Sequence, residues 1–137
     1  MKKPFSYFEH DADIGIVGQG KTVEQAFESA ARAVFSIMTN LDAIHARDEI
    51  RVEFEETDLE FALVIWINLI LGKARESGMV FNEFHLQRNG QYWHAEVSGE
   101  KWREEHERGV EVKGATFTML SVKQNPGGWE ARCVVDV

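Results

Sequence analysis

Residues 84–98 read FHLQRNGQYWHAEVS and set the character of the whole chain. On either side of Asn89-Gly90, apolar and polar side chains alternate with the two-residue period of a strand that has one buried face. Asn-Gly is the dipeptide most typical of a two-residue hairpin turn. Residues 84–88 and 92–98 are therefore predicted to form a hairpin, which makes antiparallel sheet the framework of the molecule.

The strands predicted around this hairpin extend the same pattern. Upstream, strands are expected at residues 5–8, 14–17 and 50–55. Downstream, residues 110–122 predict one long strand with a bulge at its glycine. Residues 129–137 are expected to return antiparallel to that strand after a Pro-Gly-Gly turn.

Residues 22–38 carry apolar side chains at helical spacing and predict an amphipathic helix. Thr22 is a good N-cap, Gln25 completes a capping box with it, and Asn40 is expected to end the helix. The sequence GQGKT at 18–22 superficially resembles a phosphate-binding loop, but it lacks the first glycine of that motif. The favoured interpretation is a turn at residues 18–20, which ends the preceding strand, followed by an N-cap.

A second helix is predicted over residues 59–71. It is apolar on nearly all sides, Trp66 included, so it is expected to be the central, buried helix. Thr57 and Glu60 form its predicted capping box. The helix is expected to end at one of two glycines, Gly72 or Gly78.

Two early helices followed by an antiparallel meander predict an α+β fold. The expected architecture is a two-layer sandwich, with both helices packed on one face of a mainly antiparallel sheet. At 137 residues the chain is expected to form a single domain spanning 1–137.

The charge balance limits the classes of partner. Fifteen Lys and Arg residues stand against 23 Asp and Glu residues, a formal net charge of −8, with a pI near 5.1. A nucleic-acid-binding protein usually presents a basic face that displaces counterions from phosphates. No direct nucleic-acid binding is therefore expected, and a role in RNA chemistry would run through a protein partner. The charged segment between Gly99 and Gly109 is interpreted as a loop.

Neither a disulfide nor a membrane segment is expected. Cys133 is the single cysteine and lies in a valine-rich strand, where a small buried side chain is the favoured interpretation. The longest apolar run, residues 61–71, is too short to span a bilayer. No apolar run follows the basic N-terminus, so no signal peptide is expected. These features predict a cytoplasmic protein.

The sequence lacks the common catalytic motifs. It contains no P-loop, G-x-G-x-x-G, G-x-S-x-G, H-E-x-x-H or paired C-x-x-C. Three histidines are interpreted as structural, His85 and His94 as half-exposed sheet residues and His45 as a loop residue. No recognisable nucleophile turn supports an enzyme.

Two aspartates are candidates for a metal site. Asp13 opens one predicted strand and Asp136 ends another, so both carboxylates can project from a sheet rim without being buried. Hard divalent cations bind several oxygen ligands, to which the Val137 main chain can add. The alternatives are two unrelated surface acids, or Asp11 and Asp13 capping the turn through their side chains. From spacing alone, these alternatives are favoured.

Lys113 is a third candidate. It stands in a predicted strand of mostly apolar and β-branched side chains. If this strand neighbours the C-terminal one, Lys113 lies near Asp136 and can pair with its carboxylate. A solvated strand lysine is an equal alternative.

Taken in order along the chain, these segments resemble the archease family over nearly the whole length. The residues that carry the resemblance are HDADIGI at 10–16, Gly20-Lys21-Thr22, Ala26-Phe27-Glu28, Met38-Thr39, Asp58-Leu59-Glu60, Trp66-Ile67-Asn68, Gly99-Glu100, His106, Glu111-Val112-Lys113 and Val135-Asp136-Val137. Their order and spacing, rather than any one motif, make the resemblance specific.

The resemblance implies a small acidic accessory protein rather than an enzyme. Archeases activate the GTP-dependent RNA-splicing ligase that joins tRNA halves, promoting its guanylylation and its multiple turnover. Some are described as chaperone-like modulators of a tRNA methyltransferase. By the same resemblance, Asp13 and Asp136, with the Val137 main chain, would bind a divalent metal ion, for which calcium is expected. Lys113 would be the functional lysine.

Two positions depart from the family pattern. Asp11 stands where threonine is usual and adds negative charge beside the site. Thr118 stands where a histidine often follows the aromatic residue, so it is left out of the site. A metal-dependent hydrolase is a further interpretation, with two carboxylates but no placed nucleophile or general base.

Overall fold

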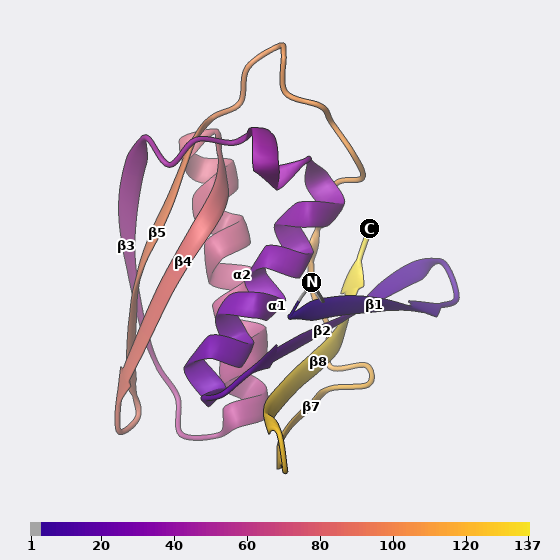
Figure 1. The fold of residues 1–137 in the computed structure, drawn as a ribbon, viewed down its shortest axis with the longest axis vertical. Coiled ribbons are helices and arrows are strands. Elements are labelled where there is room, and N and C mark those ends of the chain that lie inside the picture. Colours follow the sequence, from indigo (N-terminus) through magenta and orange to yellow (C-terminus); the bar gives the residue numbers. More distant parts are fainter. Residues whose placement is uncertain (1–3) are drawn as a thin grey trace.

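Eight strands and two helices build the fold in the computed structural model, which describes residues 4–137 (Figure 1). In chain order the elements are β1 (Phe5–His10), β2 (Asp13–Gly20), α1 (Val23–Met38), a 3₁₀ turn η1 (Leu41–Ala43), β3 (Asp48–Glu55), α2 (Leu59–Ser77), β4 (Met79–Asn89), β5 (Tyr92–Lys101), β6 (Gly114–Ala115), β7 (Ser121–Asn125) and β8 (Gly128–Asp136).

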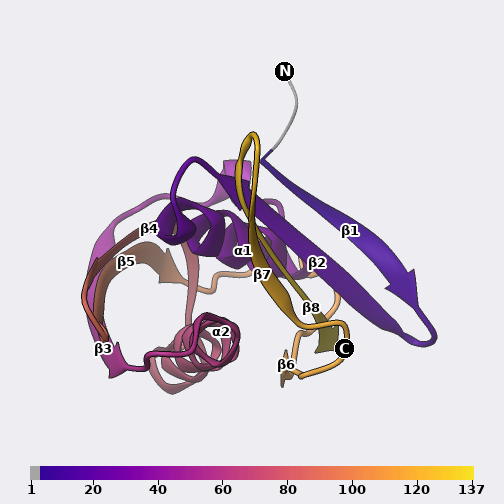
Figure 2. The same ribbon diagram turned by 90° about the horizontal axis from the view of Figure 1, so that it is seen from below.

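The strands form two antiparallel sheets. One has the order β1-β2-β8-β6, with β7 also paired to β8, and the other has the order β3-β5-β4. Viewed from below, both helices lie between the two sheets (Figure 2). The predicted α+β class, with two helices against antiparallel strands, is confirmed. The strands are divided between two sheets because the helices offer apolar side chains on more than one side.

Helix α1 begins as the sequence predicts. The Thr22 hydroxyl accepts a hydrogen bond from the Gln25 backbone N–H at 3.1 Å, and the Gln25 side chain accepts one from the Lys21 N–H at 3.0 Å. The predicted turn at residues 18–20 is wrong, since β2 continues through Gly20. A Cβ atom on Gly18 would lie 2.3 Å from the Ala26 carbonyl oxygen, so glycine lets the strand approach the helix closely.

Helix α2 is the buried helix that the sequence predicts, although its cap differs. Asp58, not Thr57, is the N-cap, and its carboxylate accepts a hydrogen bond from the Phe61 N–H. Gly78 ends the helix in the left-handed conformation at φ 68°. The Trp66 indole is fully buried and donates to the Phe27 carbonyl at 2.9 Å, which ties α2 to α1. Within residues 4–137, no helix is long and apolar enough to cross a membrane.

The β4–β5 hairpin is confirmed, with Gly90 at φ 65° in its turn. Its inward side chains complete the aromatic centre of the core, where Trp93 stacks on Phe27 and Phe54 at centroid distances of 5.1 and 5.5 Å. Strand β5 runs on to Lys101. The expectation that the charged loop begins directly after Gly99 is therefore wrong.

The prediction of one continuous strand over residues 110–122 is also wrong. Within residues 110–122, only β6 and β7 form strands that pair with β8, and residues 116–120 form an irregular loop between them. Before β6, the chain bonds to the end of α1 instead, with the Gly109 and Val110 N–H groups donating to the carbonyls of Met38 and Ile37. Carbonyls at a helix C-terminus have no partner within the helix, and this segment provides the donors. The turn into β8 and its antiparallel return occur as expected.

Candidate functional site

The two candidate aspartates lie at the ends of neighbouring strands. In the β2–β8 pair, Ile14 stands opposite Val135, and Asp13 and Asp136 are the next residues outward on their strands. Opposed positions on antiparallel strands direct their side chains to the same face of the sheet. On its other side Asp136 pairs with Gly114 of β6, so the end of β8 lies between the first residues of β2 and β6.

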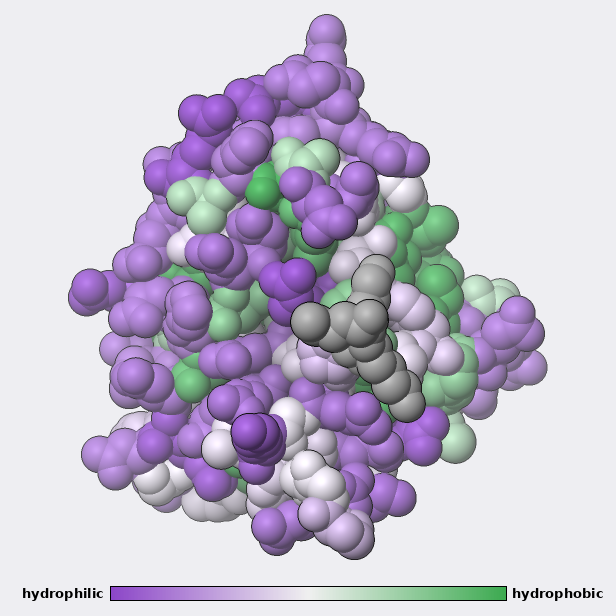
Figure 3. Space-filling view, viewed as in Figure 1, coloured by the Kyte–Doolittle hydropathy of each residue, from purple (hydrophilic) through white to green (hydrophobic). Residues whose placement is uncertain are grey.

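The Val137 main chain joins this rim directly. Its N–H donates to the Asp13 carboxylate oxygen Oδ1 at 3.4 Å, a contact between residues 124 apart in the sequence. Asp13 and Val137 are both partly buried, whereas Asp136 is exposed. In the space-filling view the surface is mostly hydrophilic, with apolar surface gathered around the end of the chain (Figure 3). We call Asp13, Asp136 and Val137 the carboxylate rim.

Lys113 reaches the rim through its backbone. Its N–H donates to the Asp136 carbonyl at 2.8 Å, and its side chain is exposed. Of the two alternatives for this residue, the solvated lysine describes the structure, because none of the ion pairs among residues 4–137 involves Lys113. The Lys113 backbone is thus held beside the rim, and its exposed side chain is available to another molecule.

Helix α2 fixes the segment that carries Lys113. The Asn68 side chain accepts a hydrogen bond from the Ala115 N–H at 2.8 Å, and the Arg75 guanidinium donates to the Lys113 carbonyl at 3.3 Å. Asn68 and Arg75 are seven residues apart, which places them on one face of the helix. Figure 2 shows β6 between this helix and the end of β8. The position of Lys113 therefore depends on α2 as well as on the sheet.

Asp11 lies in the β1–β2 turn rather than on the rim. It has a positive φ of 54°, a conformation that aspartate tolerates better than a β-branched residue. Its carboxylate approaches His10 Nδ1 at 3.7 Å and is 92% exposed. The Asp13 carboxylate bonds to Val137 rather than to a turn N–H, so the alternative of a capped turn does not describe Asp13.

The donor set of the rim suits a hard cation. Two carboxylates and main-chain oxygens are ligands of the kind that calcium prefers, and Asp13 Oδ1 receives only one long hydrogen bond. Among the described residues, no group of three or more His, Cys, Asp or Glu side chains gathers at any point. Further ligands at the rim would therefore be main-chain oxygens and water.

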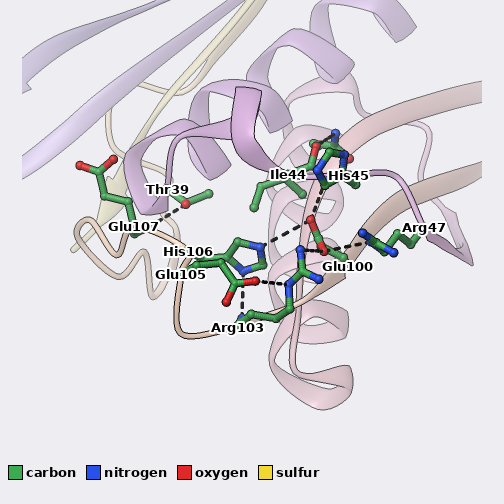
Figure 4. A network of polar contacts seen from close by, with 10 residues as sticks. Thr39, Ile44, His45, Arg47, Glu100, Arg103, Glu105, His106 and Glu107 are labelled. Carbon is green, nitrogen blue, oxygen red and sulfur yellow. Dashed lines mark hydrogen bonds and ion pairs between the residues drawn. The ribbon is translucent and has the colours of Figure 1, made fainter.

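A second carboxylate has the opposite environment. The Glu100 side chain, near the end of β5, is only 2% exposed and faces three cationic or titratable partners (Figure 4). Its Oε1 lies 2.9 Å from Arg103 Nη2 and 3.4 Å from Arg47 Nε. Its Oε2 accepts a hydrogen bond from the His45 backbone N–H at 2.7 Å and lies 3.5 Å from His106 Nε2.

These contacts hold Glu100 ionised. The backbone hydrogen bond from His45, which opposes the effect of burial, and the nearby Arg103 charge lower the pKa of Glu100 below its ordinary 4.5. His106 Nδ1 accepts from the Arg103 N–H at 2.9 Å, which assigns the proton of a neutral His106 ring to Nε2, facing the carboxylate. We call Glu100, Arg47, Arg103 and His106 the Glu100 cluster.

The Glu100 cluster fastens the loop that follows β5. His106 is buried, and the adjoining Glu107 carbonyl accepts from the Thr39 hydroxyl at 2.6 Å at the end of α1. Periodicity did not reveal this cluster, because Glu100 falls on the polar side of β5 and is covered only when the loop folds back. The paired Gly99-Glu100 and His106 were the only sequence signal, through the resemblance to a family.

The side chains of the remaining titratable candidates belong to neither region, although the His45 backbone N–H donates to Glu100. His85 and His94 are exposed on the β4–β5 sheet, and His45 lies in a loop, in line with their structural interpretation. Cys133 is fully buried, and burial raises the pKa of its thiol to about 12. The thiol is therefore an inert part of the core, as expected.

Comparisons with known proteins give one consistent result. A model of the Archease protein family matches residues 5–137. A protein archease from Sulfolobus acidocaldarius is 38% identical, covering 97% of this chain and 98% of the relative. A protein archease from Methanosarcina mazei is 35% identical, covering 98% of this chain and 97% of the relative.

Two solved structures share the fold. The solution structure of a Methanobacterium thermoautotrophicum protein superposes with a TM-score of 0.82 at 30% identity, covering 99% of this chain and all of the other. The crystal structure of a Thermotoga maritima archease, described as a possible chaperone, gives a TM-score of 0.66 at 20% identity and covers 100% of this chain and 98% of the other.

Proposed function

The chain belongs to the archease family, and on this premise we propose that it is a non-catalytic accessory protein that activates the GTP-dependent RNA-splicing ligase. It promotes guanylylation of the ligase and its multiple turnover in tRNA splicing, in the cytoplasm. Asp13, Asp136 and the Val137 main chain bind a divalent ion, expected to be calcium, and Lys113 acts beside them.

One observation carries this proposal: the carboxylate rim is assembled from strand ends far apart in the sequence. Asp13 begins β2 and Asp136 ends β8, each one residue outward from the Ile14–Val135 pair, and the Asp13 carboxylate accepts the Val137 N–H. Two carboxylates of like charge repel each other unless a cation lies between them. Asp13 and Asp136 stand one residue outward from an opposed pair on neighbouring strands, so a cation bound at the rim would offset repulsion between them, which supports a role in binding a cation.

The chain's own residues suggest how the rim acts on a ligase. A bound divalent ion would supply positive charge that phosphate oxygens can approach during nucleotide transfer. Asp13 and Asp136 hold that charge at the surface, where another protein can reach it. Lys113 presents an ammonium group from the adjacent segment, and a flexible lysine binds phosphate oxygens as a point charge.

The net charge of −8 suits this partner. A ligase that binds RNA needs a basic face for the RNA phosphates, and an acidic accessory protein is attracted to such a face without binding RNA itself. Electrostatic attraction of this kind mainly raises the association rate and weakens with salt.

The proposal is tested by following ligase guanylylation with and without this protein across a series of divalent ions. The wild-type chain should increase the guanylylation rate, most strongly with calcium. Asp13→Asn, Asp136→Asn and Lys113→Gln should each remove most of the increase while leaving the fold intact. Glu96→Gln, on β5 of the other sheet, is the matched control and should stimulate like the wild type.

Equal stimulation by the wild type and by both aspartate variants would overturn the assigned site. If the wild-type chain increases neither guanylylation nor turnover under any ion, the proposed function itself is wrong. Circular dichroism of each variant separates loss of the site from loss of the fold.

A chaperone-like modulator of a tRNA methyltransferase is the second candidate. It is favoured by the exposed large apolar side chains, among them Phe117 at 64% exposure, because such side chains bind partly folded partners. This activity would not need the carboxylates. Suppression of methyltransferase aggregation that survives Asp13→Asn would support it, whereas loss of suppression in that variant would speak for the carboxylate rim.

A further inference from the structure

Exposed apolar side chains gather where the start of α2 meets the loop that follows β6. Of the six large apolar residues that the described chain exposes, Phe61 and Phe117 are 51 and 64% exposed, and Met119, two residues after Phe117, is 54% exposed. The rings of Phe61 and Phe117 meet edge to face with a centroid distance of 5.6 Å. Phe61 belongs to the first turn of α2, and the other two belong to the 116–120 loop. We call these three residues the aromatic ridge.

The ridge is held in place before any partner arrives. The Thr116 N–H donates to the Val134 carbonyl at 3.0 Å, and the Val134 N–H donates to the Thr118 carbonyl at 3.0 Å, so the loop is fastened to β8 at two points. Met119 has a positive φ of 55°, which is unfavourable for its side chain. A rigid loop that exposes a methionine from an unfavourable backbone conformation points to a purpose other than stability.

The loop part of the ridge lies on the chain segment that also carries Lys113. Phe117 follows Lys113 by four residues, a span of at most about 14 Å. Both residues lie on the segment that contacts one face of α2, where Arg75, Asn68 and Phe61 succeed one another at intervals of seven residues. A partner that reaches Lys113 and the carboxylates therefore meets the aromatic ridge on the same side of the molecule.

We propose that the aromatic ridge is the docking surface by which this chain holds the ligase, with the carboxylate rim directed at the nucleotide site. The inference rests on the proposed function and adds its contact surface. Phenylalanine and methionine are enriched at protein interfaces, and rigid aromatic anchors lose little conformational entropy on binding.

The acidic residues around the aromatic ridge favour a basic protein as its partner. Acidic residues border the ridge: Asp58 and Glu60 precede Phe61, and both are exposed. A basic protein face with an apolar pocket complements this pattern, and the RNA-binding face of a ligase is basic. A second copy of this chain, also at −8, would bring two acidic borders together, which is unfavourable.

The experiment separates docking from activation. The dissociation constant of the purified ligase for this chain is measured by isothermal titration calorimetry, and guanylylation is measured over a range of chain concentrations. The double variant Phe61→Ser/Phe117→Ser should weaken binding at least about 30-fold, since truncation of central aromatic anchors has effects of that size. High concentrations of this variant should restore the full guanylylation rate. Asp13→Asn should instead bind well and fail to stimulate at saturation.

Two controls keep the result interpretable. Tyr92→Ser removes an equally exposed aromatic side chain, at 59%, on the other sheet, and should bind like the wild type. Met119→Lys adds positive charge without removing a ring and should also weaken binding, because the partner face is basic.

The possible outcomes are distinct. A double variant that binds within twofold of the wild type overturns the ridge while leaving the proposed function standing. A double variant that loses self-association in sedimentation, with ligase binding unchanged, also overturns the ridge, in favour of a second copy. A wild-type chain that neither binds nor stimulates the ligase overturns the proposed function and the ridge together.

Discussion

Two carboxylate regions of this molecule differ in almost every physical respect. Glu100 is 2% exposed and lies within 3.5 Å of both Arg103 and Arg47. At the carboxylate rim, Asp136 is exposed, and the Asp13 carboxylate receives one hydrogen bond of 3.4 Å. A buried carboxylate requires strong partners within the protein. At the rim, Asp13 is only partly buried and has one long hydrogen bond, and Asp136 is exposed, so both carboxylates can also bind a cation. This difference indicates that the Glu100 cluster stabilises the fold, whereas the carboxylate rim is suited to bind a ligand.

The largest loss of stability should come from replacing Glu100 with a neutral residue. In Glu100→Gln, Arg103 and His106 lose their carboxylate, and the loop after β5 loses its anchor. Removing one partner from a buried group of charges is strongly destabilising, so Tm should fall on the order of 10 °C. Thermal denaturation followed by circular dichroism provides the measurement.

Glu104→Gln is the matched control for this variant, because it removes an exposed carboxylate from the same loop. Its Tm should stay within a few degrees of the wild type. If both variants melt together with the wild type, the cluster does not hold the loop, and the contrast between the two regions is lost.

The second-largest effect should be the stabilisation of the protein by calcium bound at the carboxylate rim. Calcium should stabilise the wild-type chain by mass action, by about 2.7 kcal/mol when its concentration is 100 times the dissociation constant. Asp13→Asn and Asp136→Asn should lose this gain, and Glu104→Gln should keep it. The measurement is Tm in EDTA against Tm at increasing calcium; a gain that persists in both aspartate variants places the ion elsewhere.

A smaller effect appears in the dependence of stability on pH. The pKa of Glu100 is lowered in the folded protein, chiefly by the His45 backbone N–H, so its contribution is complete above its ordinary 4.5. That contribution is lost as the pH falls through the lowered pKa. Urea denaturation between pH 6 and pH 3 should therefore show a steeper loss of unfolding free energy for the wild type than for Glu100→Gln. Parallel curves would contradict the lowered pKa.

The sequence predicted most of the fold because local signals agree with the tertiary structure there. Asn89-Gly90 made the hairpin, Thr22 capped α1, and Gly78 was among the glycines expected to end α2. The continuous strand over 110–122 failed for a physical reason that lies elsewhere in the chain. Carbonyls at the end of α1 compete for the N–H groups of residues 109 and 110, and a sequence pattern does not reveal such a competition.

The two carboxylate regions differ in the same way. Strand ends can be read from a sequence, so Asp13 and Asp136 were found, although spacing alone did not pair β2 with β8. Glu100 was read as part of a charged loop, because a polar side chain on the outer side of β5 looks solvated until the loop covers it. Burial by a distant segment leaves no local periodicity.

The smallest expected effect concerns the aspartates of the rim in the absence of metal. Asp13→Asn keeps an oxygen that accepts the Val137 N–H, and Asp136→Asn removes an exposed charge beside a like charge. In EDTA, each variant should therefore unfold within about 0.5 kcal/mol of the wild type, with Asp136→Asn on the stabilising side. Urea denaturation in EDTA makes the measurement. A loss above about 1 kcal/mol in either variant would mean that these carboxylates support the fold as Glu100 does, and that their place at the rim reflects structure rather than binding.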